Sequence, residues 1–216
     1  MPVLSLNKWL LVFLGTYLIL IGFSLLVLQS PGVHSLLNSR LTALMFYPTV
    51  ISLVSLAVLK GLGVGFLAEL KDWKNNFKTD ALLGILYFCA YLSMIGLLLA
   101  LGLGHFMEDT KETAAISLLM GKPLLFPVLF LSVVVLAPLG EEIAFKRLLY
   151  VGMRREYSVV RAILSCSLLF VLLHSRSALL PMMLFVPVTY YMYEHHRRLP
   201  ANIILHALIN LAAIFF

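Results

Sequence analysis

Three short groups of polar residues lie within segments that are otherwise apolar enough to span a bilayer. The groups are Glu141-Glu142 with Lys146, Phe170 with His174, and His206 with Asn210. A charged side chain at the bilayer centre costs about 3 kcal/mol or more, so residues of this kind indicate a functional site. Hydrolysis needs such groups: a base that takes a proton from water, and donors that stabilise the negative charge of the transition state.

The spacing within each group predicts which side chains share a helix face. Residues four positions apart lie one turn from each other on an α-helix, as do Glu142 and Lys146, and His206 and Asn210. Glu141 points about 100° around the helix from Glu142, because consecutive helical residues are offset by that angle. The two carboxylates can therefore face different neighbours and do different jobs.

The groups are also predicted to share a depth. At about 1.5 Å rise per residue, Glu141, His174 and Asn210 lie about 18 to 24 Å along their helices from the predicted cytoplasmic interface. Polar residues that only held helices together would have no reason to share a level. The common depth favours one site near mid-membrane, inside the protein or in a water-filled cavity, since lipid offers no hydrogen bonds.

The elements that carry these residues are predicted to be membrane-spanning helices. Hydrophobic residues make up 62% of the 216-residue chain and charged residues 12%, and the mean hydropathy is +1.01. Because a spanning helix needs about 20 mostly apolar residues, we predict an all-α, polytopic bundle of about seven to eight helices. Apolar runs cover residues 9–28, 41–59, 81–103, 123–153, 158–175, 177–193 and 200–216.

Details of these runs predict the organisation of the chain. The first run is expected to be a retained span rather than a signal peptide. The run at 123–153 contains Pro138 and Gly140, so we expect one kinked helix or two shorter ones. We predict one membrane domain, in which residues 1–121 form plain spans and residues 122–216 form the functional core. The distribution of Lys and Arg among the loops predicts a cytoplasmic N-terminus.

The net charge of +6 is attributed to Lys and Arg residues that anchor cytoplasmic loops at the membrane. We therefore expect contact with membrane lipids and no nucleic-acid partner. The sequence does not indicate an oligomeric state.

The polar groups resemble the motifs of the CAAX protease and bacteriocin-processing family, which includes the type II CAAX prenyl endopeptidases. Its first motif is a Glu-Glu pair followed by an aromatic residue, an arginine and often a glycine, and the corresponding segment here is Glu141-Glu142-Ile143-Ala144-Phe145-Lys146-Arg147. Its second motif, Phe-x-x-x-His, matches Phe170 to His174. Its third, His-x-x-x-Asn or Asp, matches His206 to Asn210. The resemblance covers residues 122–216.

This resemblance implies an intramembrane endopeptidase without a metal or other cofactor. Glu141 would be the general base for the hydrolytic water, and His174 would bind or polarise that water. His206 and Asn210 would stabilise the oxyanion. The substrate would be a C-terminally lipidated protein or, in a bacterium, a peptide precursor such as a bacteriocin, and the length of the chain favours a prokaryotic cell membrane.

The chain departs from the family pattern at Lys146 and Arg147. Glu142 is expected to pair with Lys146, which orients it less firmly than arginine would, because lysine lacks a planar fork of donors. Arg147 adds bulk and charge where the family often has a small residue, so it must pair or reach the interface. These departures predict reduced activity or an altered choice of substrate.

Other interpretations of the same residues stay open. The carboxylates and Lys146 could form a structural ion pair, and the histidines and Asn210 could be interhelical hydrogen-bonding residues, with Phe170 in the core. Two glutamates and two histidines could hold zinc, although the chain has no His-Glu-x-x-His motif. The competing functional classes are a non-catalytic immunity factor or scaffold and, last, a proton-coupled transporter.

Overall fold

The computed structural model describes residues 39–61, 66–104, 126–174 and 179–215, together with residues 11, 14, 15 and 18. Every regular element within these ranges is a helix, which confirms the predicted all-α class. In chain order they are α3 (Ser39–Gly61), α4 (Phe66–Ala100), α6 (Phe126–Phe130), η2 (Leu131–Leu136), α7 (Ala137–Glu142), η3 (Ile143–Tyr150), α8 (Val151–Met153), α9 (Val159–Leu172), α10 (Leu179–His196) and α11 (Leu199–Phe215).

Two of the described helices are long and apolar enough to cross a membrane, at Lys71–Ala100 and Phe126–Met153. Shorter apolar helices cover Thr49–Val58, Val159–Leu172 and Leu199–Ile214. The predicted number of spans is therefore not confirmed. The predicted first span, at residues 9–28, lies almost entirely outside the described residues.

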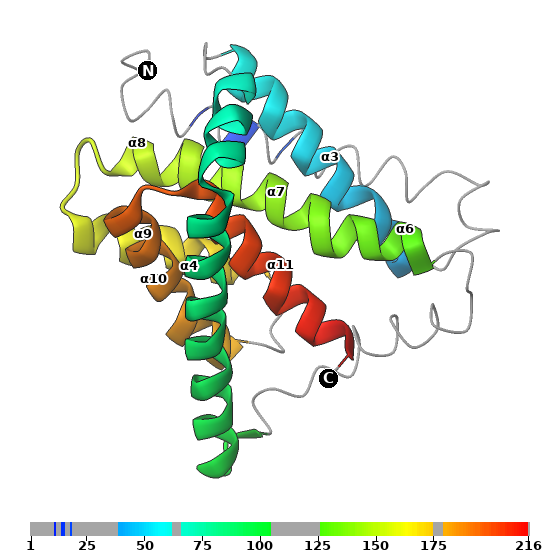
Figure 1. Cartoon of the computed structure of the whole chain (residues 1–216), viewed down its shortest axis with the longest axis vertical. Helices are drawn as coiled ribbons and strands as arrows, with labels where there is room; N and C mark the ends of the chain where they lie inside the picture. Colours follow the sequence, from blue (N-terminus) through cyan, green and yellow to red (C-terminus); the bar gives the residue numbers. More distant parts are fainter. Residues whose placement is uncertain are drawn as a thin grey trace.

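The elements from α6 to α8 follow one another without a break and form one long helix through the molecule (Figure 1). α3 packs along its η2 and α7 part, and α11 contacts the same part. α9 packs against η3 and α10. α4 lies along α11, and its C-terminal half extends beyond the other helices (Figure 1). We call the continuous helix of residues 126–153 the central helix.

The central helix changes its hydrogen-bond pattern around the two glutamates. Its segments η2 and η3 are π-helical, and α7 between them carries Glu141 and Glu142. Pro138 has no N–H to donate to the preceding turn, and the neighbouring Ala137 N–H donates to the Ser132 carbonyl, five residues earlier. The described part of the run at 123–153, from residue 126 onward, is thus one helix, and its irregularity takes the form of π-helical segments, which are frequent at functional sites.

α3 holds this irregular stretch through two serine side chains. Ser52 Oγ donates to the Leu136 carbonyl, and Ser55 Oγ donates to the Gly140 carbonyl at 3.3 Å. Gly140 permits the close approach, because a Cβ there would lie 2.6 Å from the Ser52 backbone nitrogen and 2.8 Å from its Oγ. The position of α7, and with it that of both carboxylates, therefore depends on this helix contact.

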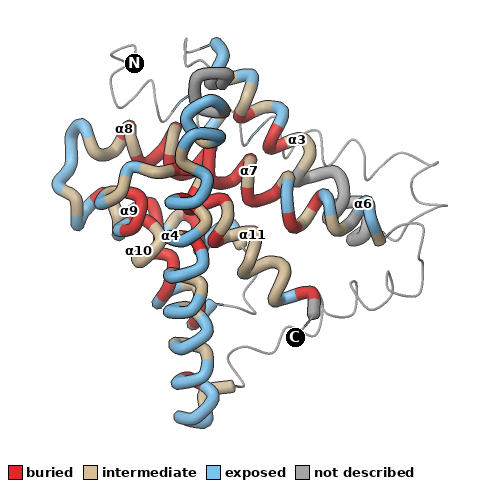
Figure 2. Tube along the Cα trace, viewed as in Figure 1, coloured by how far each residue is buried: buried red, intermediate tan, exposed pale blue. Residues whose placement is uncertain are grey.

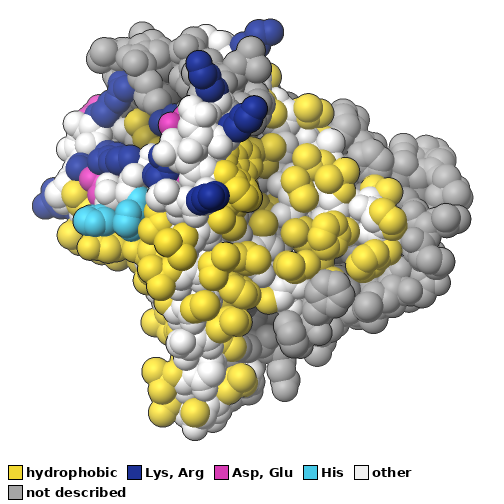
Figure 3. Space-filling view, viewed as in Figure 1, with side chains coloured by type: hydrophobic (Ala, Val, Ile, Leu, Met, Phe, Trp, Pro, Cys, Tyr) yellow, Lys and Arg dark blue, Asp and Glu magenta, His cyan; other side chains and the backbone are white. Residues whose placement is uncertain are grey.

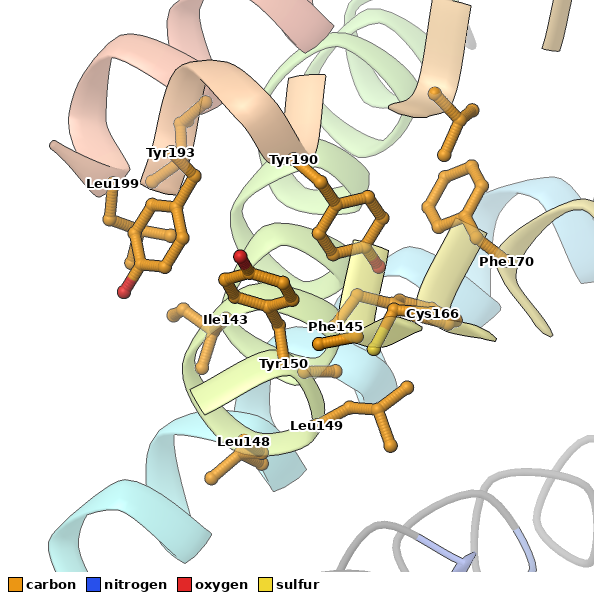
Figure 4. Close-up of a cluster of buried hydrophobic side chains, with 14 of the residues drawn as sticks. Ile143, Phe145, Leu148, Leu149, Tyr150, Cys166, Phe170, Tyr190, Tyr193 and Leu199 are labelled. Carbon is orange, nitrogen blue, oxygen red and sulfur yellow. The ribbon is translucent and has the colours of Figure 1, made fainter. Parts of the chain in front are cut away.

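The main core lies where η3 meets α9 and α10 (Figure 4). Tyr150 and Tyr190 are fully buried, with ring centroids 5.3 Å apart, and the Phe145 and Phe170 rings meet edge to face at 4.8 Å. Burial is concentrated on the central helix and its neighbours, whereas much of α4 is exposed (Figure 2). Only 11% of the apolar window in α4 is buried within the protein. That exposed surface is covered by apolar side chains (Figure 3), as expected of a lipid-facing helix.

Basic residues gather at one end of the molecule, where the loop between α10 and α11 meets the N-terminal part of α4 (Figure 3). Arg198 donates to both oxygens of Asp80, a carboxylate with 0% exposure, and lies 3.4 Å from Asp72. These hydrogen bonds raise the pKa of the Arg198 guanidinium above its ordinary value. Glu194 binds Arg154 at 3.1 Å and Arg197 at 2.8 Å. The ion pairs tie α4, α8 and α10 together at this end.

We expect Gly140→Ala to lower the melting temperature of the protein in detergent micelles by several degrees, because the new methyl group would collide with α3. Gly96→Ala is the matched control, since a Cβ at Gly96 meets nothing within 4 Å. There the exchange should be neutral or stabilising by about 1 kcal/mol, the difference in helix propensity. Equal melting temperatures for the two variants would contradict the close contact.

Asp80→Asn should also lower the melting temperature strongly. Removing one partner of a buried ion pair costs about 3 to 5 kcal/mol, because the other charge is left uncompensated. Asp72→Asn is the control: Asp72 contacts the same arginine, but its side chain is 59% exposed, so a change of less than about 1 kcal/mol is expected. If the two substitutions lowered the melting temperature equally, burial of Asp80 would not determine the contribution of its ion pair to stability.

Candidate active site

A cavity of about 250 Å³ lies between α10, α11 and the central helix. α4 and α9 each contribute one lining residue, Tyr91 and Phe170. Its polar lining comes from the predicted site residues and a few others, namely Glu142, Lys146, His174, Thr189, Asn202, His206 and Asn210. The remaining lining is apolar and includes Tyr91, Met182, Phe185, Leu205 and Ile209. The cavity therefore joins a polar group of side chains to an apolar wall.

Glu142 is fully engaged by two partners. Its Oε2 accepts a hydrogen bond from Lys146 Nζ at 2.5 Å, and its Oε1 lies 3.0 Å from His206 Nδ1. Glu142 is 4% exposed and Lys146 3%. The predicted pairing of Glu142 with Lys146, one turn along the central helix, is confirmed.

Lys146 makes further contacts that the sequence did not reveal. Its ammonium donates to Thr189 Oγ1 at 3.2 Å and lies 4.9 Å from the centre of the Tyr190 ring. Thr189 Oγ1 in turn donates to the Val186 carbonyl. In the sequence, the only indication that Thr189 belongs to the site is its hydroxyl within the apolar run of α10. Together, these contacts fix the ammonium where it can hold Glu142, although lysine lacks the fork of arginine.

Glu141 faces the second nitrogens of both histidines. Its Oε2 lies 3.4 Å from His174 Nε2 and 3.8 Å from His206 Nε2. The residue is 6% exposed, and it does not itself line the cavity, which it meets through the two imidazoles. The structure thus brings together Glu141 of the central helix, His174 at the end of α9 and His206 of α11.

His174 lies just beyond α9 rather than inside it, which corrects the predicted helix of residues 158–175. α9 ends at Leu172, and the chain tightens there, with the His174 N–H donating to the Val171 carbonyl. His174 Nδ1 lies 2.7 Å from the Phe170 carbonyl, and the two rings stack with centroids 4.0 Å apart. A carbonyl can only accept, so Nδ1 carries a proton, and whenever the ring is neutral Nε2 is its acceptor. Phe170 is 9% exposed, so it belongs to the core while it orients this imidazole.

Asn210 lies on the cavity wall and holds α11 against the central helix. Its Nδ2 donates to the Val133 carbonyl of η2 at 2.9 Å. The amide has two N–H groups, so this contact occupies one of them. Arg147, the second departure from the family pattern, is partly buried and hydrogen-bonds Tyr193.

The charged side chains of the site lie together in the apolar interior. Two carboxylates, Glu141 and Glu142, face one ammonium and two imidazoles. Glu141 with the two histidines is the set of side chains that could hold a cation, although no group of three or more His, Cys, Asp or Glu side chains in the described residues has the arrangement of a metal site. The arrangement can take a proton from water at Glu141 and stabilise negative charge beside His206.

Comparison with known proteins finds a match to a protein family. Residues 123–212 match the family described as Type II CAAX prenyl endopeptidase Rce1-like. The match contains every motif residue from Glu141 to Asn210. The C-terminal part of this chain is therefore similar to the Rce1-like family. The predicted resemblance to CAAX proteases is confirmed. No curated protein and no solved structure matches the chain.

The Rce1-like segment extends from near the start of the central helix into α11, and it includes α9 and α10. Rce1-like proteins are a membrane-embedded protease family. α4, which adds Tyr91 to the cavity, lies outside the matched segment. The cavity of this chain is therefore built mainly from the Rce1-like segment, with Tyr91 of α4 before it and Ala213 just after it.

The ion pair inside the Rce1-like segment can be tested by double substitution. Lys146→Met should lower the melting temperature, because removing one partner of a buried pair costs about 3 to 5 kcal/mol. Adding Glu142→Gln removes the uncompensated charge, so the double variant should melt higher than Lys146→Met alone. A double variant whose loss equals the sum of the two single losses would argue against direct coupling.

Proposed function

We propose that this protein is an intramembrane endopeptidase that hydrolyses a peptide bond through water activated by Glu141. The observation that supports the proposal is that the two adjacent carboxylates have different partners. Glu142 is occupied by Lys146 and His206, whereas Glu141 faces the Nε2 atoms of both histidines beside the cavity. Similarity of residues 123–212 to a protease family supports hydrolysis as the reaction class.

In the first step, a water bound near Glu141 Oε2 and His174 Nε2 gives a proton to the Glu141 carboxylate. Its oxygen attacks the carbonyl carbon of the peptide bond, and the carbonyl oxygen becomes an oxyanion. Glu141 then returns the proton to the amine nitrogen as the C–N bond breaks, so that protons and electrons balance. Because His174 donates its Nδ1 proton to the Phe170 carbonyl, its Nε2 is left to orient the water.

The oxyanion needs donors that are already in place. In this mechanism His206 acts as an imidazolium, which the Glu142 carboxylate stabilises from the Nδ1 side and which leaves Nε2–H for the oxyanion. The second N–H of the Asn210 amide is the other donor. Lys146 is a positioning residue, because it acts through Glu142 rather than on the substrate.

The substrate proposed is a peptide segment at the membrane, either a lipidated protein C-terminus or a peptide precursor. The apolar wall of the cavity beside the polar group suits a chain with one apolar flank. We further propose a multi-pass protein of a prokaryotic cell membrane with a cytoplasmic N-terminus, acting without a metal.

The decisive experiment compares Glu141→Gln with wild type in lipid vesicles, using a farnesylated peptide that ends in Cys-Val-Ile-Met as substrate. Loss of the general base should lower kcat by about 100-fold or more. Glu156→Gln, which changes an exposed glutamate of the α8–α9 connection, is the matched control and should retain full activity. Chelation with phenanthroline should leave kcat unchanged, and a loss reversed by zinc would contradict the metal-free mechanism.

Termini of membrane proteins from cells with wild type or Glu141→Gln, compared by mass spectrometry, would identify the natural substrate. A discrete set of termini that depends on Glu141 supports proteolysis. An intact cellular phenotype in the variant, with unchanged termini, would instead favour an immunity factor or scaffold that uses the same cavity for binding alone.

A further inference from the structure

Asn202 is a buried side chain whose acceptor has no partner among the described residues. It is 1% exposed, it lines the cavity, and its Oδ1 receives no hydrogen bond from the described part of the chain. A buried acceptor without a partner costs about 1 to 3 kcal/mol, so its presence beside a cavity requires a reason.

The orientation of the Asn202 amide follows from the hydrogen bond that its nitrogen makes. Nδ2 donates to the Arg198 carbonyl at 3.3 Å. Exchanging the amide oxygen and nitrogen would place two acceptors against each other, so this bond fixes Oδ1 as the remaining end. The group offered by Asn202 is therefore an acceptor, and it suits an N–H or O–H donor of a ligand.

Nearby donors of the cavity are directed elsewhere. The Lys146 ammonium is held by Glu142 and Thr189, and the Thr189 hydroxyl donates to the Val186 carbonyl. The Tyr190 hydroxyl points toward Cys166 in the core (Figure 4). None of these side chains supplies the hydrogen bond that Asn202 Oδ1 lacks.

Asn202 also continues the polar row of α11. Asn202, His206 and Asn210 follow one another at intervals of four residues, which places them on one face about 6 Å apart along the axis. An extended peptide advances about 3.3 Å per residue. One step along the row therefore equals about two residues of an extended chain.

We propose that Asn202 Oδ1 binds a backbone N–H of the substrate, about two residues from the peptide bond that is cleaved beside His206 and Asn210. The proposal rests on the proposed function for the location of that bond. In this arrangement His206 and Asn210 of α11 act on the scissile carbonyl. Asn202, one turn before His206, fixes the register of the peptide along α11. Asn202 is thus a substrate-binding residue in a place outside the family motifs quoted above.

The test measures binding of the farnesylated Cys-Val-Ile-Met peptide, and of versions with one N-methyl group moved along its backbone, to the full-length protein in vesicles. The Glu141→Gln background prevents consumption of the peptide. We expect methylation at one position to weaken binding about tenfold, and Asn202→Leu to weaken binding of the unmodified peptide by a similar factor. In Asn202→Leu that methyl group should cause no further loss.

In Asn202→Leu, methyl groups at the other backbone positions should change binding as they do without the substitution, which separates loss of the acceptor from damage to the fold. An identical methylation profile in Glu141→Gln with and without Asn202→Leu would overturn the proposal, as would binding that no methyl group weakens. Cleavage by wild type is recorded in parallel. If the Asn202 pattern appears without cleavage, hydrolysis fails as the function while the binding site stands; if no peptide binds, both fail.

Discussion

The structure depends on pairing charges within an apolar interior. Glu142 cannot stay ionised there without partners, and Lys146 and His206 supply them from opposite sides. Lys146 is itself fixed by Thr189 and Tyr190 of α10. One ion pair thus joins the central helix to α10 and α11 and gives His206 its orientation. Glu141, one residue earlier, is then left to face the two imidazoles.

This pairing requires a backbone that presents two adjacent glutamates to different neighbours. The π-helical segments on either side of α7 and the close contact of α3 at Gly140 provide it. The serines of α3 bond carbonyls of the central helix near a proline that disturbs the regular ladder. The N-terminal helices are therefore part of the site's support, although they contribute few groups to the cavity.

Helical periodicity and depth predicted much of the site. The four-residue spacing predicted the Glu142–Lys146 pair. The depths of Glu141, His174 and Asn210 predicted one site, and His174 and Asn210 do line one cavity, beside which Glu141 lies 3.4 Å from His174. Other features depend on contacts between distant segments, which no local pattern contains. Asp80 looks like an ordinary surface residue until Arg198, 118 positions later, covers it. The apolar run at 81–103 likewise predicted only the C-terminal part of α4. The helix begins at Phe66, in a more polar stretch.

The contact between α4 and α11 has a consequence for how the chain can be divided. Gly84 lets α4 approach so closely that a Cβ there would lie 2.7 Å from Ile204, and the buried Asp80 meets Arg198 at the start of α11. A fragment consisting of the Rce1-like segment alone would expose this face of α11. It would also leave Arg198 without Asp80, its buried partner on α4. Any chimeric protein that receives this segment, or exchanges it between relatives, should therefore include α4 from the same parent.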